Sequence, residues 1–226
     1  IYAIGDIHGC LDLFDELIEA IERDDSEAAP ATRTTVILLG DLVDRGPDSA
    51  AVVARAREWQ ARRAVRILAG NHEEMFLESF ENIEILRHFL KHGGRETLLS
   101  YGLAQRTLED ATLEELFDLM PQLVPPQERA FIAGFENAIV AGDYLFVHAG
   151  IRPGVPLEEQ ERKDMLWIRE PFLKSEQQHP FMVVHGHTIC ETADEQPNRI
   201  GIDTGAFRSG ILTALVIESD RRRYIQ

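Results

Sequence analysis

The sequence predicts an α/β fold, α+β-like in its second half, in which two mixed β-sheets pack face to face with helices outside. Three observations support this prediction. Strand and helix patterns alternate in the first third of the chain, which is typical of parallel strands joined by right-handed crossovers. A helical stretch then occupies about 74–135. Strand patterns return after residue 138, where a Gly142-Asp143 turn indicates an antiparallel hairpin, and we expect antiparallel pairing from there onward.

The elements of the first third follow from their patterns. Short apolar runs predict buried strands at residues 2–4, 36–39 and 65–69. Apolar residues at helical spacing predict a helix over 11–21, and a second helix is expected over about 48–63. The polar segment 24–33 predicts a loop.

The stretch 74–135 is expected to be a helical insertion that leans over the site, inside a single catalytic domain of residues 1–226. Thr112 and Glu115 form a candidate capping box. Helix breakers are expected to divide the stretch at Gly93-Gly94, Gly102, Pro121 and Pro125-Pro126.

The second half has strand patterns of its own. They lie at residues 139–140, 144–147, 181–184, 199–202, 211–217 and 222–225. Residues 155–172 show no sustained period, so we expect this segment to be mostly irregular.

Composition and charge argue against several classes of partner. The 226-residue chain has a net charge of −16, whereas binding to nucleic acid or an anionic membrane needs a basic surface. No apolar run approaches the ~20 residues that a membrane span requires. The two cysteines, Cys10 and Cys190, lack C-x-x-C spacing, which argues against a thiolate zinc site and favours a cytoplasmic location. Ile1 already lies in a strand-like run, so we expect residues to precede it.

Polar motifs follow predicted strands at five places. The central one, residues 39–46, carries Asp41, Asp44 and Arg45 directly after a buried run. The others are Gly5-Asp6-Ile7-His8-Gly9, Gly70-Asn71-His72-Glu73, His148-Ala149-Gly150 and Gly186-His187-Thr188. Because open α/β sheets bind ligands at the carboxyl ends of their strands, we expect these motifs to meet.

Six residues of these motifs are candidate metal ligands. They are Asp6, His8, Asp41, Asn71, His148 and His187. Mixed carboxylate, amide and imidazole ligands suit Mn²⁺, Fe or Zn²⁺ better than Ca²⁺. Six ligands are too many for one open catalytic metal, so we expect two divalent ions ~3.5–4 Å apart, bridged by one carboxylate and arranged for attack on phosphorus. The hypothesis rests on the ordered set, because each short motif alone is common in turns.

The motifs around Asp6, Asp41 and Asn71 resemble the signature of the PPP family, the metal-dependent serine/threonine protein phosphatases among the calcineurin-like metallophosphoesterases. The two later histidine motifs resemble those of its bacterial and phage members, as do residues 93–102, 166–169 and 203–206. The resemblance covers nearly the whole chain and implies the calcineurin-like fold. Ile189 stands where broader metallophosphoesterases often carry a further histidine, which favours the PPP-like subgroup.

The resemblance implies which residue binds which metal. Asp41 would bridge the two ions, and the remaining ligands would be Asp6 and His8 for the first and Asn71, His148 and His187 for the second. Asn71 is also expected to contact substrate. We expect Mn²⁺, with Fe or Zn²⁺ as alternatives.

The resemblance also implies the other catalytic roles. His72 would be the general acid that protonates the leaving alkoxide, oriented by a hydrogen bond to Asp44. Arg45 would grip the phosphate, because its planar guanidinium matches phosphoryl oxygens bidentately. The second phosphate-binding arginine is expected to be Arg169, with Arg152 as the alternative.

Two further polar residues are assigned supporting roles. Glu73 is interpreted as a structural hydrogen-bond acceptor and not as a metal ligand. His185 lies two residues before His187, on the same strand face, but a core or supporting role is favoured over metal ligation.

The leading functional hypothesis is a metal-dependent phosphomonoester hydrolase that acts on phosphoserine or phosphothreonine in proteins or peptides, extending to phosphotyrosine. The alternative is symmetrical diadenosine tetraphosphate hydrolysis or a related nucleotide reaction. Symmetrical hydrolases tend to replace the second aspartate of the central motif, so Asp44 discriminates between the two. A metal-binding scaffold with decayed catalysis would have lost the general acid or a ligand, and His72 is present.

Overall fold

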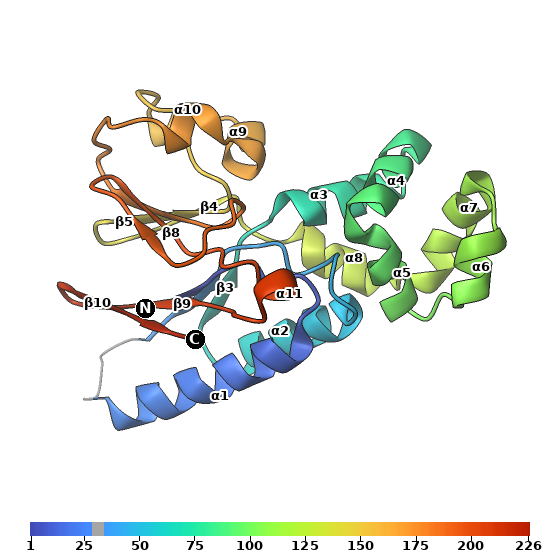
Figure 1. Ribbon diagram of the computed structural model, residues 1–226, viewed down its shortest axis with the longest axis horizontal. Helices are drawn as coiled ribbons and strands as arrows, with labels where there is room; N and C mark the ends of the chain where they lie inside the picture. The colour runs from blue at the N-terminus through green and yellow to red at the C-terminus, as the bar shows by residue number, and fades with distance from the viewer. Residues whose placement is uncertain (29–33) are drawn as a thin grey trace.

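The computed structural model describes residues 1–28 and 34–226, and within them two mixed sheets pack face to face between helices (Figure 1). The first sheet contains, in spatial order, β10 (Arg221–Ile225), β9 (Ala214–Glu218), β1 (Tyr2–Ile4), β2 (Val36–Leu38) and β3 (Val65–Ile67). The second contains β4 (Ala138–Ala141), β5 (Tyr144–Val147), β6 (Met182–His185), β8 (Arg199–Gly201) and β7 (Asp194–Glu195). The predicted two-sheet architecture is confirmed.

Strand direction in the second sheet differs from the prediction. The hairpin of β4 and β5 is antiparallel as expected, but β5, β6 and β8 run parallel to one another. The reason is that the connection from β5 to β6 contains α9 (Arg162–Trp167) and α10 (Glu170–Leu173), which cross the outer face of the sheet and return the chain to the same end. The last strands, β9 and β10, join the first sheet instead, with β9 antiparallel to β1.

Helices cover the outer face of each sheet. Helices α1 (Leu11–Glu27) and α2 (Ser49–Arg62) lie below the first sheet in Figure 1, and α9 and α10 lie above the second. The predicted helical insertion is also present and forms the right-hand part of the molecule in that view. It comprises α3 (Asn71–Glu78), α4 (Ile83–Phe89), the π turn η1 (Leu90–Gly94), α5 (Arg95–Ser100), α6 (Gln105–Asp110), α7 (Leu113–Leu123) and α8 (Pro126–Ala133).

Alternation along the strands divides the core. Ala3 of β1 packs between the sheets with Ile37 and Phe146, whereas Tyr2 and Ile4 point to the opposite face, toward α1 and α2. The buried residues of the insertion belong to the same hydrophobic cluster as this outer face of the first sheet. The insertion therefore shares one core with the outer face of the first sheet and its helices.

Several local predictions are wrong at their boundaries. Helix α1 continues to Glu27, because Asp24 in its last turns is held by the hydroxyl of Tyr2 and by Arg223; the rest of the predicted loop, residues 29–33, lies outside the described residues. Pro121 does not break α7, which ends two residues later, so little helical hydrogen bonding is lost. The capping box of Thr112 and Glu115 is confirmed.

The second half contains further differences. The segment 155–172 is not irregular, because it holds η2 (Leu157–Glu159), α9 and α10, whose apolar side chains pack on the second sheet. The strand predicted over 211–217 is β9, and it begins only at Ala214. The carbonyl of Ile211 instead accepts a hydrogen bond from the hydroxyl of Thr204. No helix among the described residues is long and apolar enough to cross a membrane.

Candidate metal centre

The carboxyl ends of five strands gather the six candidate ligands in one buried cluster. Asp6 and His8 follow β1, and Asp41 follows β2. Asn71 follows β3 as the first residue of α3, and His148 and His187 follow the parallel strands β5 and β6. The predicted meeting of the motifs is therefore what parallel strand direction produces.

Asp41 lies at the centre of this cluster. Its Oδ2 atom is 3.5 Å from Nε2 of His8, and its Oδ1 atom is 3.4 Å from Nε2 of His148. Two groups of potential ligand atoms share this carboxylate: one contains His8 and His72, and the other contains His148 and His187. A carboxylate shared by two groups is the geometry that a bridging ligand needs.

Asp6 lies at the edge of the first group. Its Oδ2 is 4.0 Å from Nε2 of His8, and its carboxylate accepts hydrogen bonds from the backbone N–H of His187 at 3.0 and 3.1 Å. Gly186 permits this approach, because a Cβ at that position would lie 2.0 Å from Oδ1 of Asp6. The glycine of the Gly-His motif thus lets the first and last ligand loops touch.

Backbone conformation sets the site apart. In the described part of the chain, six non-glycine residues have a clearly positive φ, and five of them belong to the motifs of the candidate site. These five are His8, Asp41, Asp44, Arg45 and His187. Left-handed conformations are unfavourable for residues with a Cβ and persist where the surroundings impose them, often at functional sites.

Backbone carbonyls orient two of the imidazoles. Nδ1 of His8 bonds to the carbonyl of Val43 and Nδ1 of His148 to that of Leu39, each at 2.8 Å. A carbonyl only accepts, so Nδ1 carries the proton and the Nε2 lone pair faces the cluster. Nε2 of His148 then lies 3.0 Å from Oδ1 of Asn71, so two acceptors face each other. A cation bound by both atoms would remove this unfavourable contact.

The charges of the cluster fit the same conclusion. Burial, followed by the negative charges of Asp203 and Asp41, raises the pKa of Asp6 well above its usual range. Burial lowers the pKa of His8 to about 3 and also lowers the pKa of His148, so both imidazoles are neutral at pH 7. Crowded carboxylates beside neutral imidazoles form a ligand set suited to divalent cations. The residues present therefore fit a dinuclear divalent metal site.

His72 and Asp44 form a buried pair beside this cluster. Nδ1 of His72 lies 2.7 Å from Oδ2 of Asp44, and its Nε2 lies 3.9 Å from Oδ2 of Asp41. Burial lowers the pKa of His72, but Asp41 and Asp44 raise it by more, so the net shift is upward. The arrangement can hold a proton on an imidazole next to the candidate metal ligands.

Arg45 crosses the mouth of the cluster. Its guanidinium bonds to Nε2 of His8 at 2.8 Å and to Nε2 of His72 at 2.9 Å, under the ring of Phe207 at 4.9 Å. A metal on His8 or a proton on Nε2 of His72 requires the guanidinium to leave that nitrogen. Arg45 is thus placed where an incoming anion would meet it.

Comparison with known proteins is consistent with this geometry. The family model described as calcineurin-like phosphoesterase matches residues 1–198. The chain belongs to this family. It is therefore a metal-binding phosphoester hydrolase of the metallophosphoesterase type, which agrees with the ligand set described above.

Relatives of this phosphoesterase have different names. An asymmetrical bis(5'-nucleosyl)-tetraphosphatase of Bacillus velezensis is 27% identical, over 93% of this chain and 86% of the relative. Serine/threonine-protein phosphatase 1 of Salmonella typhimurium is 28% identical, over 96% and 92%. A symmetrical bis(5'-nucleosyl)-tetraphosphatase of an Acidovorax species is 35% identical over 70% of this chain, which spans only 47% of that relative.

A solved structure supports the fold. The crystal structure of a cold-active protein-tyrosine phosphatase of a Shewanella species has a TM-score of 0.65 and 19% identity, and the match covers 100% of this chain and 80% of that one. At this identity the likeness shows a common fold alone.

The two candidate arginines of the phosphoesterase occupy different surroundings. Arg169 lies against the site, with Nη2 3.4 Å from the carbonyl of His187 and Nη1 3.5 Å from the hydroxyl of Thr188. Arg152 is instead engaged by both carboxylate oxygens of Asp164, at 2.8 and 2.9 Å. The geometry thus places Arg169 next to a candidate ligand with its guanidinium only weakly engaged, whereas the guanidinium of Arg152 is held by Asp164.

Glu73 and His185, which were predicted to be structural residues and not metal ligands, are both buried. Glu73 is buried, and its carboxylate accepts backbone N–H groups of Gly70, Asp41 and Leu42 at 2.7 to 2.9 Å, which joins two ligand loops. His185 is buried, packs its ring against Phe172 at 5.1 Å and belongs to neither group of potential metal ligands.

Asp203 was not assigned a role from the sequence. It is buried near Asp6, its Oδ1 accepts the backbone N–H of Gly205, and its Oδ2 has no hydrogen-bond partner. Burial raises its pKa to about 6. The signal was available, because Asp203 follows the apolar end of β8 and precedes a Thr-Gly pair, as the other motifs follow their strands.

Proposed function

We propose that this phosphoesterase is a phosphomonoester hydrolase, specifically a serine/threonine protein phosphatase with dual specificity as an extension, and that residues 1–226 act as one catalytic domain. The observation that carries the proposal is the buried pair of His72 and Asp44, 2.7 Å apart. A serine or threonine alkoxide is a poor leaving group and needs a proton as the P–O bond breaks. A phosphoanhydride releases a phosphate, which leaves without one.

The proposed ligand sets divide at Asp41. The first ion would be held by Asp6, His8 and Asp41, and the second by Asp41, Asn71, His148 and His187. Mn²⁺ is the first candidate, with Fe or Zn²⁺ as alternatives. When bound, such ions lower the pKa of a shared water and offset charge on phosphoryl oxygens.

The other side chains are proposed to bind and protonate the substrate. A phosphate group would draw the Arg45 guanidinium away from His8 and His72 into a bidentate contact. Nε2 of His72, once released, would deliver its proton to the leaving oxygen while Asp44 holds Nδ1. Arg169 and the amide of Asn71 would complete the phosphate contacts at the side of His187.

A dinucleotide tetraphosphate is the second candidate substrate. The relatives named as symmetrical and asymmetrical bis(5'-nucleosyl)-tetraphosphatases favour it, at identities comparable to that of the protein phosphatase. Asp44 argues for the phosphomonoester, because symmetrical hydrolases tend to replace this aspartate and an anhydride makes less demand on a general acid.

A side-by-side steady-state assay with added Mn²⁺ tests the proposal. It compares a phosphoserine or phosphothreonine peptide, p-nitrophenyl phosphate and diadenosine tetraphosphate, for the wild type and His72→Asn. We expect efficient turnover of the phosphopeptide and a loss of about 10²–10⁴-fold in the variant. Cleavage of the dinucleotide alone would move the function to nucleotide hydrolysis. Unchanged peptide turnover in His72→Asn would remove the general-acid assignment.

A further inference from the structure

The helical insertion contacts the proposed catalytic pair through one hydroxyl. Thr97 lies on α5, and its Oγ1 donates to Oδ1 of Asp44 at 2.6 Å while it accepts the backbone N–H of Asp44 at 2.9 Å. The two residues are 53 positions apart, and both are fully buried. A hydrogen bond to a buried carboxylate is charge-assisted and hence stronger than one between neutral groups.

Asp44 is thereby held at both oxygens. Oδ1 accepts from Thr97, and Oδ2 lies 2.7 Å from Nδ1 of His72. Ser49, the first residue of α2, adds a hydroxyl 2.9 Å from the Asp44 N–H and 3.0 Å from Oγ1 of Thr97. Partners on both oxygens fix the plane of the carboxylate and therefore the direction in which it holds the imidazole.

The same insertion supports the backbone next to this carboxylate. Asp44 and Arg45 both have left-handed φ values, 72° and 70°. The N–H of Arg45 donates to the carbonyl of Gly93 at 3.1 Å. Gly93 must be glycine here, since its φ is 108° and a Cβ would lie 2.5 Å from the Arg45 nitrogen. The insertion thus contacts both strained residues that flank the candidate phosphate site.

We propose that Thr97 is a positioning residue for the general acid: its hydroxyl fixes the Asp44 carboxylate so that Nε2 of His72 is directed at the leaving oxygen. This inference rests on the proposed role of His72, and therefore on a substrate whose leaving group needs a proton. It gives the insertion a part in proton transfer.

Leaving-group dependence separates positioning from a merely structural role. A poor leaving group needs the proton in the transition state, whereas a good one departs as the anion and needs little help. Loss of metal binding or of phosphate contacts would slow both classes alike. A misdirected general acid slows only the poor leaving group.

The experiment compares Thr97→Val with the wild type, both loaded with Mn²⁺, on phenyl phosphate and on 2,4-dinitrophenyl phosphate. We expect kcat for phenyl phosphate to fall by about 10- to 100-fold, in line with loss of a hydrogen bond to a charged group, and kcat for the dinitrophenyl ester to change by less than about 3-fold. Thr97→Ser keeps the hydroxyl and should restore most of the lost rate. Thr107→Val on α6 of the same insertion, whose hydroxyl makes no hydrogen bond among the described residues, is the matched control and should behave as wild type.

The outcomes separate this inference from the assignment it rests on. Equal losses on both esters, or none on either, would overturn the role of Thr97, provided that His72→Asn shows the leaving-group dependence. If His72→Asn shows no dependence, the general-acid assignment itself fails. If the wild type cleaves only dinucleotides, whose leaving phosphate needs no general acid, the substrate proposal fails and the role of Thr97 in proton transfer fails with it.

Folding of the variants is checked by thermal unfolding, because Thr97 is buried. Thr97→Ala, which removes the hydroxyl without adding a branched apolar group, is the second variant and carries the same expectation. A double-mutant cycle with Asp44→Asn adds a readout: Thr97→Val should cost little more once the carboxylate is gone. Additive losses in the cycle would contradict the inference.

Discussion

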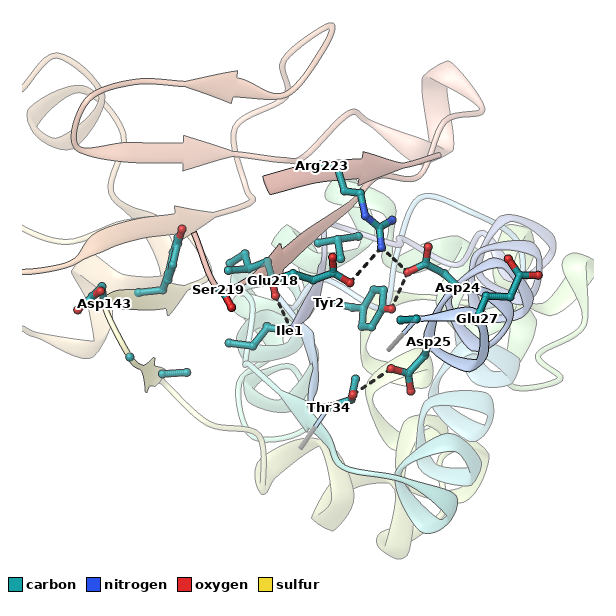
Figure 2. A pocket seen from close by; sticks show the side chains of 16 residues that line it. Ile1, Tyr2, Asp24, Asp25, Glu27, Thr34, Asp143, Glu218, Ser219 and Arg223 are labelled. Carbon is teal, nitrogen blue, oxygen red and sulfur yellow. Dashed lines mark hydrogen bonds and ion pairs between the residues drawn. The ribbon is translucent and has the colours of Figure 1, made fainter. Parts of the chain in front are cut away.

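The two edges of the β-sandwich differ in how their polar side chains and their backbone are arranged. At the edge away from the metal centre, a cavity of about 1010 Å³ lies between the amino end of β1, the β4–β5 turn and the β9–β10 hairpin (Figure 2). Several of its polar groups are paired with each other: Asp24 accepts from the Tyr2 hydroxyl at 2.6 Å and from Arg223 at 2.5 Å, and Asp25 accepts from Thr34. Asp24 and Asp25 of this lining thus already have partners.

The edge that carries the candidate metal centre, called the metal edge here, differs in burial and in backbone conformation. There the carboxylates and imidazoles are buried, and Nε2 of His187 and Oδ2 of Asp203 have no hydrogen-bond partner in the described structure. Five residues adopt left-handed conformations there. Buried polar groups without partners and strained backbone both raise the free energy of the fold, so they persist where function requires them. In this molecule the left-handed residues cluster at the candidate metal centre, whereas unpartnered buried atoms also occur elsewhere, for example Nε of Arg63 and the hydroxyl of Tyr101.

The largest effect that would sharpen this contrast is expected at Asp41. Asp41→Asn removes the negative charge shared by the two groups of ligands, and we expect kcat with Mn²⁺ to fall by at least about 10³-fold because several kcal/mol of charge stabilisation is lost. Metal content after gel filtration should fall with it. Asp143→Asn at the opposite edge is the control and should retain both activity and metal. Equal losses in the two variants would end the distinction between the edges.

A smaller loss of activity is expected when Arg169 is replaced, which tests whether this residue belongs to the phosphate-binding site. Arg169→Ala should raise KM for a phosphomonoester by about 10-fold, because one charged contact to phosphate is lost while the metal ligands remain. Arg152→Ala should leave KM unchanged, because Asp164 already binds that guanidinium. Steady-state kinetics on both variants measure the two KM values. A larger effect at Arg152 would make Arg152, and not Arg169, the second phosphate-binding arginine.

The sequence predicted that the candidate ligands would lie together, because each of them follows a recognisable strand end. An apolar run that stops at a glycine and a polar residue marks a strand end, and the parallel order of β1, β2 and β3 brings three such ends together. Gly186 illustrates why the signal is sharp: the approach of Asp6 leaves no room for a Cβ. At these positions the residues that mark a strand end in the sequence are the same residues that the fold brings together.

The remaining features have no local signal. Nothing in the neighbouring sequence shows that Thr97 contacts Asp44. The contact arises only in the fold, because the two residues are 53 positions apart. The parallel direction of β6 depends on α9 and α10, whose few apolar residues are too short a sample to show a helical period. The two-residue strand β7 exists only through its pairing with β8. Each of these depends on contacts between distant segments.

The smallest effect is expected at the opposite edge. Tyr2→Phe removes one hydroxyl from Asp24, and we expect the free energy of unfolding at pH 7 to fall by about 1 kcal/mol or less, since Asp24 is partly exposed and keeps its contact with Arg223, with no change in kcat. Arg223, and then Tyr2, lower the pKa of Asp24, so this carboxylate stabilises the fold above its ordinary pKa and loses that effect as the pH falls through the lowered value. The difference between wild type and Tyr2→Phe should therefore shrink in acid. Denaturant unfolding at pH 7 and pH 3 measures it, and a change in kcat of more than about 2-fold would show that the edges are coupled and not independent.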